Sequence, residues 1–256
     1  MITINTMTFN LRTDTPHDGI NNFLLRTPRI LSFLRREQPD LIGFQEATDL
    51  IRTWLRENLC HEYTLLGCGR GADYRGESTV LAYRTNQFEM IEARTLWLSP
   101  TPQIPASTYG CDQSACPRIV TMARLKHMEG ERPFWFINTH FDHIGSSARQ
   151  KEAGQLTAII DALKEPFILT GDFNALPDSP EMQAICKHTG CPIRDVTADI
   201  GGTFHAFGMR ETPYKIDYIF TNAEHTAKNV RLIEDAGEHG VYLSDHYPII
   251  ADIQLP

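Results

Sequence analysis

One order of elements occurs twice in this chain, and it constrains the fold more than any other feature of the sequence. In the first copy, an apolar strand ends at residues 8–10 and a helix with one apolar face follows over residues 27–37. A second apolar strand, residues 41–44, then leads to Glu46. Each strand therefore ends in a polar residue, and a helix lies between the two strands.

The second copy has the same order. A strand over residues 134–138 leads to His140, and a helix runs from about Ser147, its expected N-cap, over residues 147–164. The strand 167–169 then leads to Asp172. Continuously apolar strands are buried on both faces, so the helices between them must cover the sheets.

The remaining segments complete this pattern. Apolar runs predict further strands at residues 79–83, 119–125, 218–221 and 249–253. Two more helices are expected at residues 48–58 and 180–187, the second with Ser179 as N-cap. Residues 99–117 are rich in Pro, Ser and Cys and are expected to form a long loop. This order favours an α/β fold of two sheets packed face to face with helices outside.

The composition narrows the class of protein. The 256 residues carry a formal net charge of -8, without the basic balance typical of nucleic-acid binding. No linker divides the chain, so we expect a single domain over residues 1–256. No signal peptide or apolar membrane span is apparent, which favours a cytoplasmic protein without a membrane partner. The six cysteines include two C-x4-C pairs, which are looser than a zinc knuckle, so reduced thiols are expected ahead of zinc.

Acidic and amide residues at the strand ends suit the hydrolysis of a phosphate ester, which needs an oriented water and stabilised charge. Glu46 is either a metal ligand or a polar cap of its strand. Asp172 and Asn174 alternate to one side of an extended chain, although an Asx-turn would use the same residues. Asp217 lies within an apolar run and needs a partner, for which a histidine is the natural choice.

Taken in order, these segments resemble the endonuclease/exonuclease/phosphatase superfamily over nearly the whole chain. The motifs that carry the resemblance are Phe9-Asn10-Leu11, Gln45-Glu46, Gly76-Glu77, Asn138-Thr139-His140, Gly171-Asp172-Phe173-Asn174, Ile216-Asp217-Tyr218 and Ser244-Asp245-His246. The resemblance implies a four-layer αββα sandwich, in which two packed mixed sheets are flanked by helices and the site lies at one edge of the sheets.

The resemblance also implies a role for each motif residue. Glu46 would be the main ligand of Mg²⁺ or Mn²⁺, with Asn10 and Asp245 in or beside the coordination shell. Asp172 would orient or activate water, and Asn174 would contact the scissile phosphate.

Two carboxylate–histidine pairs are implied beside the phosphate. His246 would pair with Asp217, and His140 would pair with Glu77. The motifs leave open which histidine is the general acid and whether one metal ion or two act.

Further segments, among them Pro117-Arg118, Thr139-His140-Phe141-Asp142-His143 and Gly202-Thr203-Phe204-His205, resemble a group of compact bacterial proteins with sugar-phosphate phosphatase relatives. Arg12, Arg118 and Arg149 lie near motifs and are candidates to grip phosphate, with a surface arginine as the alternative for each. His143 and His205 are further candidates for substrate binding.

We therefore predict a Mg²⁺- or Mn²⁺-dependent phosphoesterase that uses in-line attack by water on a small phosphorylated metabolite such as a sugar phosphate. An endo- or exonuclease acting on DNA or RNA is the first alternative. A catalytically silent binding module of the same fold is the second. No obligate protein partner is evident from the sequence.

Overall fold

The computed structural model describes residues 2–222 and 224–255. These residues form two six-stranded sheets, packed face to face. The first has the order β11-β12-β1-β2-β4-β3, with bounds Thr226–Leu232, Ile249–Leu255, Ile2–Asn10, Leu41–Ala47, Ser78–Arg84 and Tyr63–Leu66. The second has the order β5-β6-β7-β8-β10-β9, with bounds Phe88–Trp97, Ile119–His127, Pro133–His140, Phe167–Asp172, Asp217–Asn222 and Ile193–Asp195.

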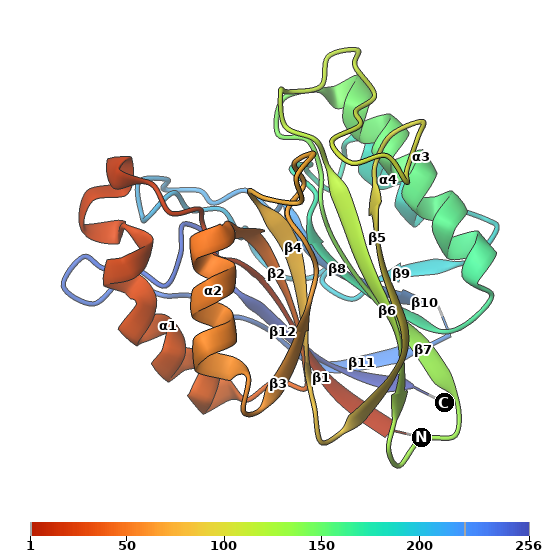
Figure 1. Ribbon diagram of the computed structural model, residues 1–256, viewed down its shortest axis with the longest axis horizontal. Helices are drawn as coiled ribbons and strands as arrows, with labels where there is room; N and C mark the ends of the chain where they lie inside the picture. The colour runs from red at the N-terminus through yellow and green to blue at the C-terminus, as the bar shows by residue number, and fades with distance from the viewer. Residues whose placement is uncertain (1, 223, 256) are drawn as a thin grey trace.

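Helices cover the outer face of each sheet, as Figure 1 shows. Helices α1 (Phe23–Glu37) and α2 (Asp49–Leu59) lie on the first sheet, after the 3-10 helix η1 (Pro16–Asn21). Helices α3 (Ser146–Leu163) and α4 (Pro180–Cys186) lie on the second. The expected αββα sandwich is confirmed.

The repeated order of elements explains how the two halves are built. β1 and β2 pair in parallel around α1, and β7 and β8 pair in parallel around α3. All other strand pairs within the described residues are antiparallel. Because parallel strands end at the same edge of their sheet, each half brings two polar strand ends together.

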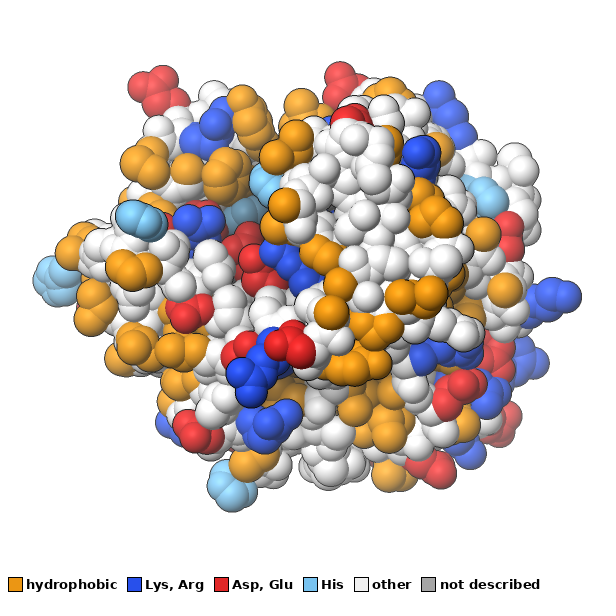
Figure 2. Space-filling model, turned by 45° about the horizontal axis from the view of Figure 1, so that its top comes forward, with side chains coloured by type: hydrophobic (Ala, Val, Ile, Leu, Met, Phe, Trp, Pro, Cys, Tyr) orange, Lys and Arg blue, Asp and Glu red, His pale blue; other side chains and the backbone are white. Residues whose placement is uncertain are grey.

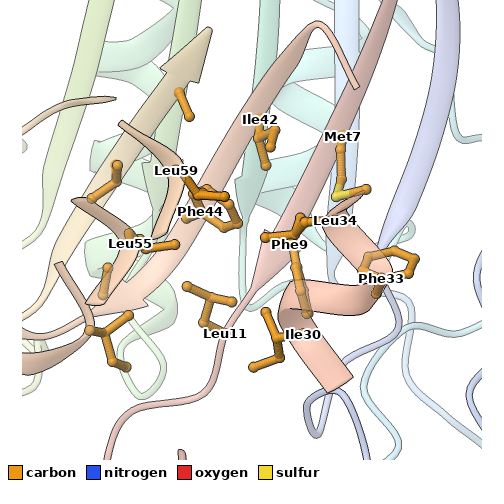
Figure 3. Packing of buried hydrophobic residues seen from close by; sticks show 14 of the residues in the cluster. Met7, Phe9, Leu11, Ile30, Phe33, Leu34, Ile42, Phe44, Leu55 and Leu59 are labelled. Atoms are coloured by element: carbon orange, nitrogen blue, oxygen red, sulfur yellow. The ribbon is translucent and has the colours of Figure 1, made fainter. Parts of the chain in front are cut away.

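The core is divided by the two sheets. One apolar cluster lies between the first sheet and its helices, where Phe9 and Phe44 of the strands meet Leu34 of α1 and Leu55 of α2 (Figure 3). A second cluster lies between the other sheet and α3 and α4, and a third fills the space between the sheets. Burial of these side chains supplies most of the stability that holds the strand ends in place.

Helix α1 begins a turn earlier than the sequence indicated, at Phe23 instead of residue 27. Asn22 caps it by accepting a hydrogen bond from the Leu24 amide. Pro28 lies inside the helix and has no N–H for the Leu24 carbonyl. The Thr27 hydroxyl donates to that carbonyl at 2.8 Å, so the helix continues through the proline.

The start of α3 corrects a second expectation. Ser147 is not the N-cap, because the cap position is Gly145. The carboxylate of Asp112 instead accepts from the amides of Ser147 at 3.0 Å and Ala148 at 2.9 Å. The long loop at residues 99–117, which is present as expected, therefore packs on the helix N-terminus.

The other two helices agree with the sequence. α2 and α4 begin after Thr48 and Ser179, whose side chains accept from the amides of Ile51 and Met182. Among the described residues, no helix has the length and apolar character needed to cross a membrane.

Candidate active site

Most of the predicted site residues meet in one cleft of about 330 Å³ at the edge where β1, β2, β7 and β8 end. In Figure 2, acidic, basic and histidine side chains gather in this hollow. Of the predicted residues, those that line the cleft are Arg12, Glu46, Glu77, Arg118, His140, His143, Asp172, Asn174, Asp245 and His246. Asn10 and Asp217 lie behind this lining and contact it, whereas Arg149 and His205 lie outside it.

Glu46 is turned into the cleft by its backbone. It has a φ of 58° at the point where the β2–β4 register shifts, between Phe44 and Ala47. Its two oxygens accept from the Asn10 amide nitrogen at 3.0 Å and from the Thr13 backbone N–H at 2.8 Å. Burial opposes ionisation, but the His246 charge and these hydrogen bonds lower the pKa of Glu46, which is therefore a carboxylate.

Asp172 occupies the centre of the site. One oxygen accepts from the Asn10 side chain at 2.9 Å and lies 3.6 Å from His140 Nε2 and 3.9 Å from His246 Nε2. Burial and the charge of Asp217 raise the pKa of Asp172 to about 7. This carboxyl group is therefore suited to take up a proton near neutral pH.

Asn174 is held by local contacts. Its backbone N–H donates to Asp172 at 2.9 Å, which is the Asx-turn that its sequence allowed. Its side-chain nitrogen donates to the Phe141 carbonyl and to His140 Nε2, both at 3.0 Å. Asn174 thus orients His140 and sits on the cleft surface beside Asp172.

The expected pair of His246 and Asp217 is present. His246 Nδ1 donates to Asp217 at 2.8 Å, and both side chains are buried. Burial opposes the charged imidazole, but the Asp217 carboxylate raises the pKa of His246 to about 10. His246 is therefore a cation in the cleft, and its Nε2–H remains available.

The expected pair of His140 and Glu77 is not formed among the described residues. Glu77 instead accepts from Arg70 Nη2 at 2.8 Å, and the Arg70 backbone N–H donates to the Glu77 carbonyl. Burial and the charge of Arg118 lower the pKa of His140 well below its usual value, so this imidazole is neutral. The two histidines thus differ in charge although their motifs look alike.

Arg70 is a cleft residue that the sequence reasoning missed. It lies in the glycine-rich segment between β3 and β4, which folds back on itself so that Arg70 meets Glu77. Trp97 Nε1 donates to the Arg70 carbonyl at 2.8 Å and anchors this segment. The several glycines around Arg70 were the one sequence signal that this loop is tightly folded.

The acidic residues of the cleft suit a divalent cation. Ligand atoms of Glu46, Asp172 and His246 lie within 4.8 Å of one another. His246 is protonated, so the available ligands are carboxylate oxygens, including that of Asp245, whose pKa burial and the Glu46 charge raise. Several hard oxygens that repel one another are the donor set that Mg²⁺ or Mn²⁺ stabilises.

Asn10 supports this cluster through its amide. Its nitrogen donates to both Glu46 and Asp172, while its oxygen accepts from the Arg12 backbone N–H at 2.9 Å. Arg12 itself forms a two-point ion pair with Asp18 and lies 3.8 Å from Asp245. One side of the cleft is therefore a connected network of carboxylates and their donors.

Arg149 and His205 are placed differently from the sequence expectation. Arg149 pairs with Glu181 and donates to the Asp142 carbonyl, so it joins α3 to α4 rather than facing the cleft. His205 is buried and stacks on Tyr247, with ring centroids 3.9 Å apart. In both cases side chains from distant parts of the chain engage the candidate group.

Comparisons with known proteins agree with this geometry. A sequence model of the Endonuclease/Exonuclease/phosphatase family matches residues 7–246, which span every motif above. A solved endonuclease/exonuclease/phosphatase from Bacteroides vulgatus is 31% identical, with 100% of each chain covered and a TM-score of 0.91. A mannosyl-6-phosphatase from Bacteroides thetaiotaomicron is 27% identical over 98% of this chain and 100% of its own, with a TM-score of 0.88.

More distant structures share the fold alone. The human Nocturnin catalytic domain is 18% identical over 99% of this chain and 94% of its own, with a TM-score of 0.76. A search of curated proteins found no match.

Proposed function

The chain belongs to the endonuclease/exonuclease/phosphatase family, and we propose on this basis that it is a Mg²⁺- or Mn²⁺-dependent phosphoesterase acting on a small phosphate ester such as a sugar phosphate. One observation carries the proposal. Asp172 lies 3.6 Å from His140 Nε2 and 3.9 Å from His246 Nε2, beside a cluster of carboxylates, and burial raises the pKa of its carboxyl group. This arrangement supplies a base, a proton donor and a cation site for hydrolysis by water.

Glu46 and Asp245 would hold the cation, with Asn10 orienting Glu46. When bound, the ion supplies Lewis-acid stabilisation of the charge on the phosphoryl and leaving oxygens. Arg12 fixes Asp245 from the other side, 3.8 Å away.

Asp172 is placed to accept a proton from the attacking water. Asn10 and the Asn174 backbone hold its two oxygens, so the carboxyl group has one orientation toward the cleft. A base with a pKa near the working pH transfers protons most effectively. In-line attack then requires this water to lie between Asp172 and the phosphorus atom, on the side opposite the leaving oxygen.

His246 is placed to stabilise the transferring phosphoryl group. Its proton on Nδ1 is held by Asp217, which leaves the Nε2–H free to donate to a phosphoryl or leaving oxygen. His140 is neutral and fixed by Asn174, so it acts as a hydrogen-bonding group rather than a charge.

Three observations support a small substrate. The cleft volume of about 330 Å³ lies within the range of small-molecule sites. The net charge of -8 disfavours a long polyanion. A structural neighbour with 27% identity is a mannosyl-6-phosphatase. We further propose a single domain in the cytoplasm, since all six cysteines are free thiols.

A parallel assay tests this function. Mannose 6-phosphate, an aryl phosphate, a phosphodiester, and single- and double-stranded DNA and RNA are compared with Mg²⁺ and with Mn²⁺. We expect the highest kcat/KM for a monoester, with a shallow salt dependence, because a small ester displaces few counterions. Efficient nucleic-acid cleavage with a steep salt dependence would support the nuclease alternative, and no turnover at all would support the binding module.

A matched pair of variants tests the assignment of the site. Asp217→Asn removes the charge that holds His246, and we expect activity to fall about a hundredfold or more. Asp161→Asn is the control, because Asp161 pairs with His188 away from the cleft. Equal activity of the two variants would contradict the role of Asp217.

A further inference from the structure

Arg118 is a buried cation with unused hydrogen-bonding capacity. It lies in the wall of the cleft with 2% of its surface exposed. Its Nη2 donates to His143 Nδ1 at 2.7 Å, and its Nη1 has no hydrogen-bond partner among the described residues. A desolvated guanidinium nitrogen without a partner is costly, so the site favours a ligand that can accept from it.

Asp142 holds Arg118 in place without fully satisfying it. The Asp142 carboxylate lies 3.5 Å from Arg118 Nε, at the limit of a hydrogen bond. Its oxygens already accept from the backbone amides of Ser114, Ile144 and Gly145. The positive charge of Arg118 is therefore positioned by Asp142 but remains available to an anion in the cleft.

The neighbours of Arg118 on this wall are also donors. An arginine cannot accept a hydrogen bond, so His143 Nδ1 is the acceptor in their contact and its proton lies on Nε2. The exposed His143 thus offers an N–H. Arg70 lines the same cleft, although Glu77 engages one of its nitrogens. This donor wall, Arg70, Arg118 and His143, contrasts with the carboxylates of Glu46 and Asp245.

The reacting phosphate has other partners. Asp172, Asn174 and His246 surround the position assigned to it under the proposed function, and the carboxylates beside them supply the cation site. The donors of the Arg118 wall are therefore free for a different part of the substrate. Charge-assisted bonds from Arg are strong and favour planar or tetrahedral anions.

We propose that the donor wall is a second anion subsite, which selects phosphate esters whose leaving group carries a further phosphate or carboxylate. The inference rests on the proposed phosphoesterase function and specifies its substrate class. A neutral sugar phosphate would be hydrolysed, but without contact to Arg118. A sugar bisphosphate or a phosphorylated sugar acid would use both sites.

Two matched substrate pairs test the subsite. Fructose 1,6-bisphosphate is compared with fructose 6-phosphate, and 6-phosphogluconate with glucose 6-phosphate, so that the two pairs distinguish a second phosphate from a carboxylate. We expect kcat/KM to favour at least one of the substrates that carry a second anionic group by about tenfold, equivalent to about 1.4 kcal/mol. The preference should appear mainly in KM, because the donor wall would bind the second anion equally in the ground state and in the transition state.

Variants link this ratio to Arg118. In Arg118→Gln the ratio should fall to about one, and Arg118→Lys should recover part of it because the charge returns without the planar guanidinium. His143→Ala replaces an exposed side chain, so this variant should fold even if Arg118→Gln does not. His143→Ala should also lower the ratio, because it removes one donor of the wall. The control is Arg75→Gln, an exposed arginine in the segment that carries Arg70, which should leave the ratio unchanged.

Several results would overturn the subsite. They are a wild-type ratio near one for both pairs, a preference that survives both Arg118→Gln and His143→Ala, or an equal loss for both members of a pair. The last would mean that Arg118 contacts the reacting phosphate. Failure of the proposed function looks different, since the wild type would then hydrolyse none of these small esters. Calorimetric binding of fructose 1,6-bisphosphate and fructose 6-phosphate would still measure the ratio in that case.

Discussion

The two ends of the layer between the sheets differ sharply in chemistry, although the same strands form both. Along β7, Phe134 and Phe136 face the other sheet at one end, and Asn138 and His140 follow on the same face in steps of two residues. Along β8, Ile168 is part of the same apolar cluster. One end of each strand thus packs against the other sheet, and the other end carries residues of the candidate site.

A polar middle layer separates these two ends. Asn138 donates to the carbonyls of Phe44 at 2.8 Å and Val80 at 3.1 Å, and accepts from Gln45 at 2.7 Å and Thr170 at 3.1 Å. The bonds with Phe44, Val80 and Gln45 cross from the second sheet to the first, and the bond from Thr170 stays within the second sheet. Apolar contacts tolerate small slips, whereas directional hydrogen bonds fix the register of the sheets directly beneath the site.

Close packing reinforces this layer. Gly43 faces it, and a Cβ on that residue would lie 2.0 Å from Thr170 Oγ1. The two sheets therefore approach each other here more closely than any side chain at position 43 would allow. Within one interface, the apolar end therefore supplies stability, and the polar layer fixes the relative position of the strands.

The largest effect is expected at the end that carries the candidate active site. Glu46→Ala should lower kcat by about a thousandfold or more, because it removes a proposed cation ligand that stabilises transition-state charge. Stability should change little, since Glu46 lies at the cleft surface. Kinetics at saturating Mn²⁺ and thermal denaturation measure the two effects. The exposed Glu57→Ala is the control, and full wild-type activity in excess chelator would contradict the metal requirement.

At the apolar end the opposite result is expected. Phe136→Ala should lower the free energy of unfolding by about 3 to 5 kcal/mol, because it leaves a cavity between the sheets. The kcat per folded molecule should stay close to that of the wild type. Urea denaturation and active-site titration separate the two quantities. A large fall in kcat for the folded fraction would show that the two ends are not independent.

The middle layer should affect both quantities. Asn138→Leu leaves the Phe44 and Val80 carbonyls without their donor, which should cost about 2 to 3 kcal/mol of stability. We also expect kcat to fall about tenfold, because a shift of the strands misplaces His140. Asn58→Leu is a matched control on α2. An unchanged kcat in Asn138→Leu would reduce the layer to a purely structural role.

The smallest effect tests a buried polar group outside this interface. Glu152 on α3 accepts from the Asp142 backbone N–H, and burial raises the pKa of Glu152 to about 7. The raised pKa means that Glu152 favours folding at low pH and loses this contribution as pH rises from the unfolded value through about 7. Glu152→Gln should therefore gain about 1 to 2 kcal/mol relative to the wild type at pH 8 but not at pH 4.5. Urea denaturation of both proteins at the two pH values measures this difference. An equal difference in unfolding free energy at pH 8 and pH 4.5 would contradict the prediction.

Some features of the fold were not visible in local patterns. Strand β5 is exposed over most of its length and lacks an apolar alternation, so nothing in its sequence distinguished it from a loop. Strands β3 and β9 are too short for a periodicity to emerge. They are strands because an edge was available for pairing, which is a tertiary condition.

The sequence by itself indicated two packed sheets with helices outside and the polar strand ends of the candidate site, and its family resemblance implied the αββα sandwich and the pairing of His246 with Asp217. Periodicity and strand-end chemistry are local properties, and the repeated order of elements leaves few ways to bury two sheets. Tertiary structure alone decided that Glu77 meets Arg70 instead of His140, that Asp112 caps α3, and that Arg149 turns away from the cleft. Each of these contacts depends on how a loop or helix places a charged side chain beside a competing partner, and no local pattern in the chain records that competition.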